Sequence, residues 1–190
     1  MTSFSISAAA RNSGLTKIRL QDYRDCQEQF DGIVSVEMFE AVGEKYWPEY
    51  FQTIAKCLKA GGKACIQTIV IAEELFERYR HNTDFIQQYV FPGGMLPSRA
   101  SFKESAAKAG LQIEGEFAFG ADYAQTLCLW RDNFNQKLHE VHGLGFDEAF
   151  IRLWNFYLMY CAAGFAERNI DVVQFTLSHH PINTSNTLTL

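Results

Sequence analysis

The sequence predicts an α/β domain built around a mostly parallel β-sheet. Strand-like runs rich in β-branched residues alternate with helical segments, and a strand–helix–strand unit spans residues 31–71. Such a unit forms a right-handed crossover between parallel strands by default. The chain has 190 residues, of which 47% are hydrophobic and 21% are charged. This size and composition suit one folded domain and are too small for two ordinary ones.

The first part of the chain contains three strand candidates and one helix. Residues 16–21 alternate apolar and polar side chains, and residues 31–36 form a β-branched run suited to a buried parallel strand. Residues 44–58 place apolar side chains at helical spacing, and the Lys-Ala-Gly-Gly sequence at 59–62 is typical of a helix end. Residues 63–71 predict the next strand.

The second part continues the alternation. A Pro-Ser pair and a glycine bound a helix expected over residues 98–110, and a strand is expected over 111–118. Helical patterns cover residues 122–138 and 147–166, and residues 171–177 predict a last strand. These assignments total about five strands.

Two segments lie outside this alternation. Residues 76–97, which include a Phe-Pro-Gly-Gly sequence, are expected to form an insertion or lid. Residues 181–190 are rich in Ser, Thr and Asn and are expected to be disordered. No Gly-rich turn of the kind that binds a nucleotide follows an early strand.

Charge and targeting signals restrict the partners. The formal net charge is −5 and no run of five basic residues occurs, which argues against nucleic acid as a main partner and against a basic patch for anionic lipid headgroups. No signal peptide is apparent, and the apolar runs are shorter than the ~20 residues that cross a bilayer. We therefore expect a cytoplasmic protein whose membrane contact is peripheral.

The cysteines and histidines show no metal-ligand spacing. Five scattered cysteines without a CxxC pair predict buried free thiols in a reducing compartment. Four histidines are expected to be surface residues, so no metal site is predicted. The cysteines are Cys26, Cys57, Cys65, Cys128 and Cys161, and the histidines are His139, His142, His179 and His180.

Residues 30–51, FDGIVSVEMFEAVGEKYWPEYF, resemble the cyclopropane-fatty-acyl-phospholipid synthases and mycolic acid cyclopropane synthases. Further segments agree with that family in order and spacing, so the resemblance extends over about residues 14–178. They are LQDYRD (20–25), YVFPGGMLPS (89–98), FGADYAQTLCLW (119–130) and YLMYCAAGF (157–165) followed by DVVQFTLS (171–178).

The resemblance implies a class I, Rossmann-like methyltransferase fold that binds S-adenosylmethionine (SAM) at the carboxyl ends of its strands. Residues 1–180 would supply this domain from its third strand onward, without the first strands and their Gly-rich motif. The implied reaction is transfer of a methylene group from SAM to the double bond of unsaturated phospholipid acyl chains. The protein could also form a homodimer, and the sequence leaves this question open.

The reaction sets requirements on the site. An alkene attacks the sulfonium methyl, a carbocation develops on the acyl chain, and a base removes a proton so that the ring can close. Water must be excluded because it would trap the cation. Apolar and aromatic walls and a protected base are therefore needed, and the 14% aromatic content is compatible with them.

Candidate catalytic residues follow from the resemblance. Glu40 lies four residues beyond the strand at 31–36, in a loop that should open onto the ligand crevice. The resemblance implies that Glu40, the Gln67 side chain, the Ile69 backbone and the Tyr123 hydroxyl hold a bicarbonate ion that acts as the base. The alternatives are a solvated carboxylate for Glu40, an exposed strand-end amide for Gln67, and a tyrosine packed at a helix start for Tyr123.

Two further assignments have their own alternatives. Cys161 matches a cysteine long marked as an active-site residue of the family, but an inert buried thiol is the more common role for a cysteine in an apolar helix. Asp22, Tyr23 and Arg24 follow the strand at 16–21, where the family's loop contacts the adenine of SAM. An ordinary polar loop is the alternative.

Gln67 departs from the family pattern, because the lipid enzymes have a histidine there. An amide can donate a hydrogen bond but cannot titrate. This favours a second hypothesis, a methyltransferase acting on acyl chains without ring closure. A third hypothesis is a non-catalytic fragment that lacks cofactor affinity.

Overall fold

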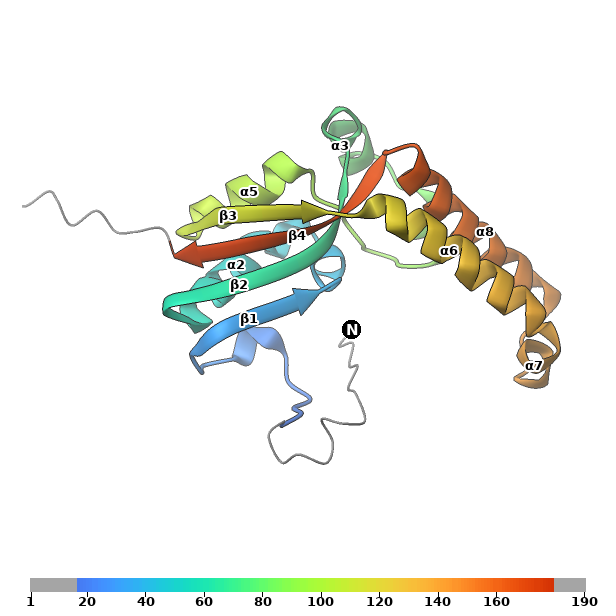
Figure 1. Ribbon diagram of the computed structural model, residues 1–190, viewed down its shortest axis with the longest axis horizontal. Coiled ribbons are helices and arrows are strands. Elements are labelled where there is room, and N and C mark those ends of the chain that lie inside the picture. Colours follow the sequence, from blue (N-terminus) through green and yellow to red (C-terminus); the bar gives the residue numbers. More distant parts are fainter. Residues whose placement is uncertain (1–16, 180–190) are drawn as a thin grey trace, which may run out of the picture.

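A four-stranded mixed sheet forms the centre of the structure (Figure 1). The computed structural model describes residues 17–179. Within them the sheet contains β1 (Phe30–Val36), β2 (Leu58–Ile71), β3 (Leu111–Ala118) and β4 (Ile170–His179) in the order β1-β2-β4-β3. β1 and β2 are parallel, whereas β4 is antiparallel to both β2 and β3. Three of the four strands therefore run in the same direction.

Helices α2 (Trp47–Cys57) and α5 (Arg99–Lys108) cover one face of this sheet (Figure 1). Both begin with recognisable signals. A proline occupies the first turn of α2, and the Ser98 hydroxyl accepts a hydrogen bond from the backbone of Ser101 to form a capping box in α5. Their buried side chains meet those of the sheet in the main core.

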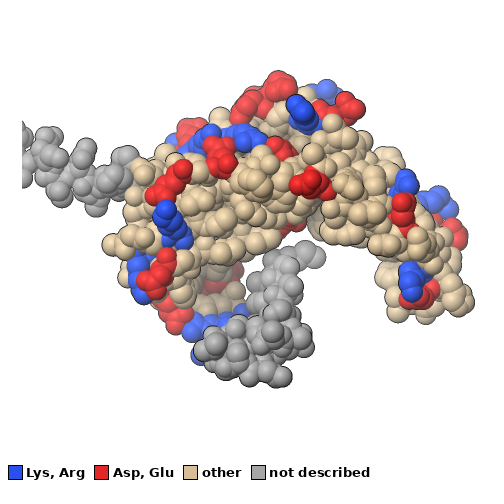
Figure 2. All heavy atoms as spheres, viewed as in Figure 1, with Lys and Arg blue, Asp and Glu red and all other residues tan. Residues whose placement is uncertain are grey.

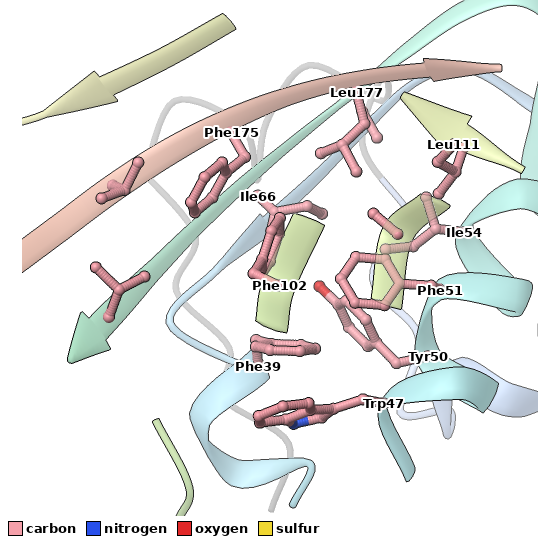
Figure 3. Packing of buried hydrophobic residues seen from close by; sticks show 14 of the residues in the cluster. Phe39, Trp47, Tyr50, Phe51, Ile54, Ile66, Phe102, Leu111, Phe175 and Leu177 are labelled. Atoms are coloured by element: carbon pink, nitrogen blue, oxygen red, sulfur yellow. The ribbon is translucent and has the colours of Figure 1, made fainter. Parts of the chain in front are cut away.

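The main core is unusually aromatic (Figure 3). Phe39 is completely buried, and its ring stacks on Trp47 with centroids 5.3 Å apart. Phe102 from α5 stacks on Phe175 from β4 at 4.1 Å. Since close aromatic pairs stabilise a core beyond the area that they bury, this cluster anchors the loop after β1 to the sheet and to both helices.

Helices α6 (Gly120–Gln136) and α8 (Glu148–Ala166) pack side by side and extend beyond the end of the sheet (Figure 1). The short α7 (Leu138–Gly143) lies at the far tip of this arm. A second, smaller core holds the base of the arm against β4, where Leu158 and Val172 are buried.

Short helices connect the larger elements. The 3-10 helices are η1 (Tyr23–Asp25), η2 (Phe39–Ala41) and η3 (Glu44–Tyr46), and two more short α-helices, besides α7, are α3 (Glu73–Arg80) and α4 (Phe85–Tyr89). The segment 76–97, expected as an insertion or lid, thus contains the end of α3 and all of α4. Met95, in this same segment, is buried in the main core.

Two predicted strand features are wrong. Residues 17–21 of the strand expected at 16–21 do not form part of the sheet, and Thr16 lies outside the described residues. A strand needs a neighbour for its backbone hydrogen bonds, and in the described chain only β2 pairs with β1. For the same reason β1 is an edge strand rather than a buried one, with Val34 73% and Val36 56% exposed.

The helix end predicted at 59–62 is also wrong. Helix α2 ends at Cys57, and Leu58 already has extended backbone angles and pairs with Phe30. The glycines instead belong to an irregularity of β2, where the register with β1 shifts between Phe30 and Gly32. A Cβ atom at Gly62 would lie 2.8 Å from the Asp31 carbonyl oxygen, so the close approach of the two strands requires glycine.

The cysteines and histidines match in part the prediction of buried free thiols and surface histidines. All five cysteines are free, but Cys57 is the one that is fully buried, and Cys128 is exposed on the arm. His139 and His142 are exposed, whereas His179 is half-buried and its Nε2 lies 2.9 Å from the Leu58 carbonyl oxygen. His180 and the tail 181–190 lie outside the described residues. Within residues 17–179 no cluster of potential ligands could hold a metal ion.

Candidate functional site

An open groove of about 2170 Å³ runs along β1 and past the carboxyl ends of β1 and β2. In α/β sheets ligands bind in the crevice outside the carboxyl ends of the parallel strands. One part of the wall is polar and includes Glu37 and Glu40. Another part is apolar and aromatic, and comes from α4, the loop after it and α8. Its aromatic members are Phe85, Phe91, Tyr157 and Tyr160.

Glu40 lies at the inner wall of this groove, on helix η2. Its neighbour Phe39 points into the aromatic core and fixes the helix, so Phe39 itself is not part of the groove wall. The backbone N–H of Ile69 donates to Oε1 of Glu40 at 2.5 Å. Oε2 is buried and makes no hydrogen bond within the described residues. Burial raises the pKa of Glu40, although the Ile69 N–H opposes this.

A polar network lies beside Glu40 on the sheet face opposite α2 and α5. The Gln67 amide nitrogen donates to Oε1 of Glu37 at 2.8 Å and to the Tyr123 hydroxyl oxygen at 3.1 Å. The Tyr123 hydroxyl donates to the same Glu37 oxygen. Gln174 on the neighbouring β4 donates to Oε1 of Gln67 at 2.9 Å, which fixes the orientation of the Gln67 amide.

Glu37 is the site residue that sequence reasoning missed. It follows β1 directly and lines the groove. Its backbone φ of 48° lies in the left-handed region, which a residue other than glycine adopts infrequently. The Glu37 N–H donates to the Gln67 carbonyl oxygen at 2.9 Å and holds this conformation. The available signal was a carboxylate at the first position after a strand whose carboxyl end opens onto the crevice.

Tyr123 lies in the first turn of α6, and its ring packs against Phe119 and Phe165. Its hydroxyl reaches from the arm to the end of β1. Burial and the hydrogen bond to the Glu37 carboxylate raise its pKa, so the phenol remains protonated and acts as a donor at neutral pH.

Cys161 lines the groove from α8. Burial raises the pKa of its thiol to about 11, opposed by a hydrogen bond with Tyr157. At neutral pH the sulfur is therefore a thiol, and a thiol is a poor nucleophile. The environment supports the alternative of a packed, inert thiol.

Asp22, Tyr23 and Arg24 divide into two roles. Tyr23 lines the groove, and its ring contacts Tyr50 edge-on at 5.7 Å. The guanidinium of Arg24 pairs with the Asp22 carboxylate at 2.7 Å, and this pair keeps the pKa of Asp22 at about 2. Both charged side chains are exposed and satisfy each other. A contact of this loop with adenine stays a prediction.

The structure thus gathers most of the predicted residues. They come from three separate stretches of sequence. Glu40 and the Ile69 N–H form one hydrogen-bonded pair, and Gln67 and Tyr123 are bonded to each other and to Glu37. Cys161 lies farther along the same groove. Carboxylates beside an aromatic wall could accept a proton or stabilise a cation.

Comparison with known proteins places this geometry in context. The family model described as mycolic acid cyclopropane synthetase matches residues 6–175. The chain is 43% identical over 171 residues to the tuberculostearic acid methyltransferase UfaA1 of Mycobacterium tuberculosis, covering 90% of this chain and 40% of that protein. It is 38% identical over 173 residues to the cyclopropane-fatty-acyl-phospholipid synthase of Escherichia coli K12, covering 90% of this chain and 44% of that protein.

The solved structures agree. The mycolic acid cyclopropane synthase CmaA1, complexed with S-adenosylhomocysteine (SAH) and CTAB, superimposes with a TM-score of 0.79 at 29% identity, over 89% of this chain and 63% of that one. This match confirms the predicted α/β methyltransferase fold. The chain spans less than half the length of the two curated relatives described above. Within residues 17–179 no helix is both long and apolar enough to span a bilayer.

Proposed function

Because the chain belongs to the mycolic acid cyclopropane synthetase family, we propose that the protein carrying it transfers a methylene group from SAM to the double bond of unsaturated phospholipid acyl chains. One observation carries the proposal most directly. The carboxylates of Glu37 and Glu40 line one groove that also has an aromatic wall. Gln67 and Tyr123 donate to Glu37, and the Ile69 N–H donates to Glu40. This combination provides proton acceptors next to a surface that suits an acyl chain.

SAM supplies an electrophilic methyl group when it is bound. The groove passes the carboxyl ends of β1 and β2, where α/β sheets bind their ligands. Its volume of about 2170 Å³ exceeds the ~300–1,000 Å³ of a common small-molecule site, so it has room for a second ligand beside SAM. Tyr23 would contact SAM from the groove wall, and Asp22 and Arg24 would border its adenine end, as the resemblance implies.

The aromatic part of the groove would hold the acyl chain. Phe85 of α4 packs edge-on against Phe156 of α8 at 4.6 Å, and Phe91 packs against Tyr157 at 6.1 Å. These contacts connect the two sides of the wall. Aromatic faces there would stabilise a developing carbocation by roughly 0.5–2 kcal/mol each and exclude the water that would trap it.

Bicarbonate fits this site poorly as it stands. The two N–H bonds of the Gln67 amide are directed to Glu37 and Tyr123, and the single Tyr123 hydroxyl proton is directed to Glu37. The donors that the resemblance assigns to bicarbonate are therefore engaged, and a free anion would also lie next to two carboxylates. We derive no step through bicarbonate.

A methyltransferase that stops before ring closure is the second candidate. Gln67 in place of the family's histidine favours it, and one relative is named as a tuberculostearic acid methyltransferase. A non-catalytic role of the chain is the third candidate.

We further propose that membrane contact is peripheral and that the protein works at the cytoplasmic membrane face. The tip of the arm supports this proposal, because Leu144 is 77% and Phe146 is 44% exposed there. On the face drawn in Figure 2, charged side chains are scattered between broad uncharged areas rather than gathered into a basic patch.

Mass spectrometry of lipids from cells that express the intact protein tests the function. Ring closure adds one CH₂ to an unsaturated acyl chain and gives a product that survives mild hydrogenation. A branched alkene has the same mass but takes up two hydrogens on mild hydrogenation, and a branched product that a separate hydride donor has already saturated is two hydrogens heavier. We expect the first product. Either branched product would favour the methyltransferase alternative, and an unchanged lipid profile would contradict both. Calorimetric titration with SAM tests the third candidate, because a folded protein that gives no heat at millimolar SAM has no useful cofactor affinity.

A further inference from the structure

We propose that Glu37 supplies, as part of the chain itself, the carboxylate that accepts the proton in this reaction, in place of a free bicarbonate ion. The proposal rests on the proposed function and assigns the base within its site. Glu37 has three properties that a fixed base needs: it faces the groove, it is held by directional donors, and its backbone is locked.

The first argument is the arrangement of donors around Glu37. Tyr123 and Gln67 both donate to one oxygen of the Glu37 carboxylate, Oε1. The Gln174 amide nitrogen donates to the oxygen of the Gln67 amide, so the oxygen and the nitrogen of that amide both have partners. Glu37 thus occupies the acceptor position that a bound anion would otherwise fill.

The second argument is the backbone at position 37. A non-glycine residue with φ of 48° is strained, and such strain persists where the surrounding structure holds it and is common at functional sites. The backbone N–H of Glu37 is fixed by the Gln67 carbonyl oxygen. The same residue, Gln67, therefore holds both the main chain and the side chain of Glu37.

The third argument separates Glu37 from Glu40. Oε1 of Glu40 accepts a hydrogen bond from the Ile69 N–H, and Oε2 is buried without a hydrogen bond in the described chain. Burial favours its neutral form. Glu37 is exposed, lines the groove and accepts hydrogen bonds from two side chains, so its carboxyl group is accessible to a substrate in the groove. By its position the proton acceptor is therefore Glu37, and Glu40 shapes the site beside it.

The chemistry balances with Glu37 as the acceptor. After the methyl carbon has bonded to one alkene carbon and its C–S bond has broken, the other alkene carbon is cationic. The Glu37 carboxylate takes a proton from the added methyl group. The electron pair of that C–H bond forms the new C–C bond to the cationic carbon and closes the ring. Glu37 is left as a carboxylic acid and returns its proton to water when the products leave.

The test uses the intact protein with Glu37→Gly and Glu37→Gln. Glycine suits a φ of 48°, so Glu37→Gly removes the carboxylate without new backbone strain. Turnover is measured in carbonate-free buffer and again with added bicarbonate or formate. We expect wild-type turnover to change less than twofold on addition. The turnover of Glu37→Gly should fall more than tenfold and should rise again at least threefold with either anion. The turnover of Glu37→Gln should fall as much but recover little, because the glutamine amide fills the position of the carboxylate.

Arg168→Gly is the matched control, because Arg168 is the other non-glycine residue with a positive φ (58°) in the described chain and is exposed. It should keep wild-type turnover. A second readout needs no turnover: calorimetric titration with bicarbonate should give saturable heat with Glu37→Gly and none with wild type. Wild-type activity that requires bicarbonate, or Glu37→Gly activity within twofold of wild type, overturns the role of Glu37. In both of these outcomes the wild type is active, so the proposed function is still supported. A wild type without activity would contradict both the proposed function and the role of Glu37.

Discussion

At the scale of single residues, the site depends on two neighbouring glutamates in different environments. Glu37 is exposed to the groove and accepts hydrogen bonds from Gln67 and Tyr123. Glu40 is three positions further along, at the start of η2, and has one buried oxygen without a hydrogen bond. The turn between them exposes the Glu37 carboxylate in the groove and places the half-buried Glu40 at its inner wall.

Glu40→Gln should lower turnover of the intact protein by more than tenfold while changing SAM affinity by less than about threefold. The reason is that a group arranged around the reacting atoms acts mainly in the transition state. Steady-state kinetics and calorimetry measure the two quantities. Turnover equal to wild type would remove Glu40 from the mechanism.

Glu40 should also make stability depend on pH. Because its pKa is raised in the folded state, the folded protein favours the protonated form. Its stabilising contribution is complete below the ordinary value of 4.5 and is lost as pH rises through the folded-state pKa. Relative to Glu40→Gln, the wild type should therefore lose free energy of unfolding as pH rises from 4.5. Urea denaturation of both proteins over this range measures the difference, and parallel curves would contradict the buried acid.

At the scale of elements, the aromatic core links the loop that carries the site to the sheet and its helices. The ring of Phe102 in α5 packs against three other rings. The distances between ring centroids are 5.3 Å to Phe39, 5.0 Å to Phe51 and 4.1 Å to Phe175. It thereby connects η2, α2, α5 and β4. The position of Glu40 is consequently a property of this core as much as of its own loop.

Phe102→Ala should reduce the free energy of unfolding by about 3–5 kcal/mol, because it leaves a cavity among fully buried rings. Urea denaturation measures the change. Leu144→Ala is the control, since Leu144 is 77% exposed at the arm tip and should change stability by less than about 0.5 kcal/mol. A similar small change for Phe102→Ala would contradict the packing described.

At the scale of the whole molecule, the sheet is covered unequally within residues 17–179. Helices α2 and α5 cover one face, and the arm of α6 and α8 contacts the other near β4 (Figure 1). Val34 and Val36 of β1 are largely exposed, so the groove is wide and open along this strand. The arm supplies Tyr123 and Cys161 to the site, which makes the placement of α6 and α8 on β4 part of its geometry.

The sequence by itself determined the local elements and the family. Periodicity and caps predicted the four longer helices and the strands β1, β3 and β4 within a few residues, because these signals are local. The fourth strand, β2, was also predicted, but it begins earlier than expected. The motif around residues 30–51 predicted Glu40 as a site residue, and its order with the later segments predicted Gln67, Ile69 and Tyr123. The burial of β1 could not be predicted, because burial depends on which neighbours a strand has.

The tertiary structure alone decided how these parts meet. The insertion of antiparallel β4 between β2 and β3 places Gln174 beside Gln67, although they are 107 positions apart. Glu37 and Tyr123 are separated by 86 positions, and their hydrogen bond depends on the arm docking at the end of the sheet. Side-chain hydrogen bonds form only at contact distance, and strand order and helix docking set those distances. For this reason the role of Glu37 became visible in the fold and not in the sequence.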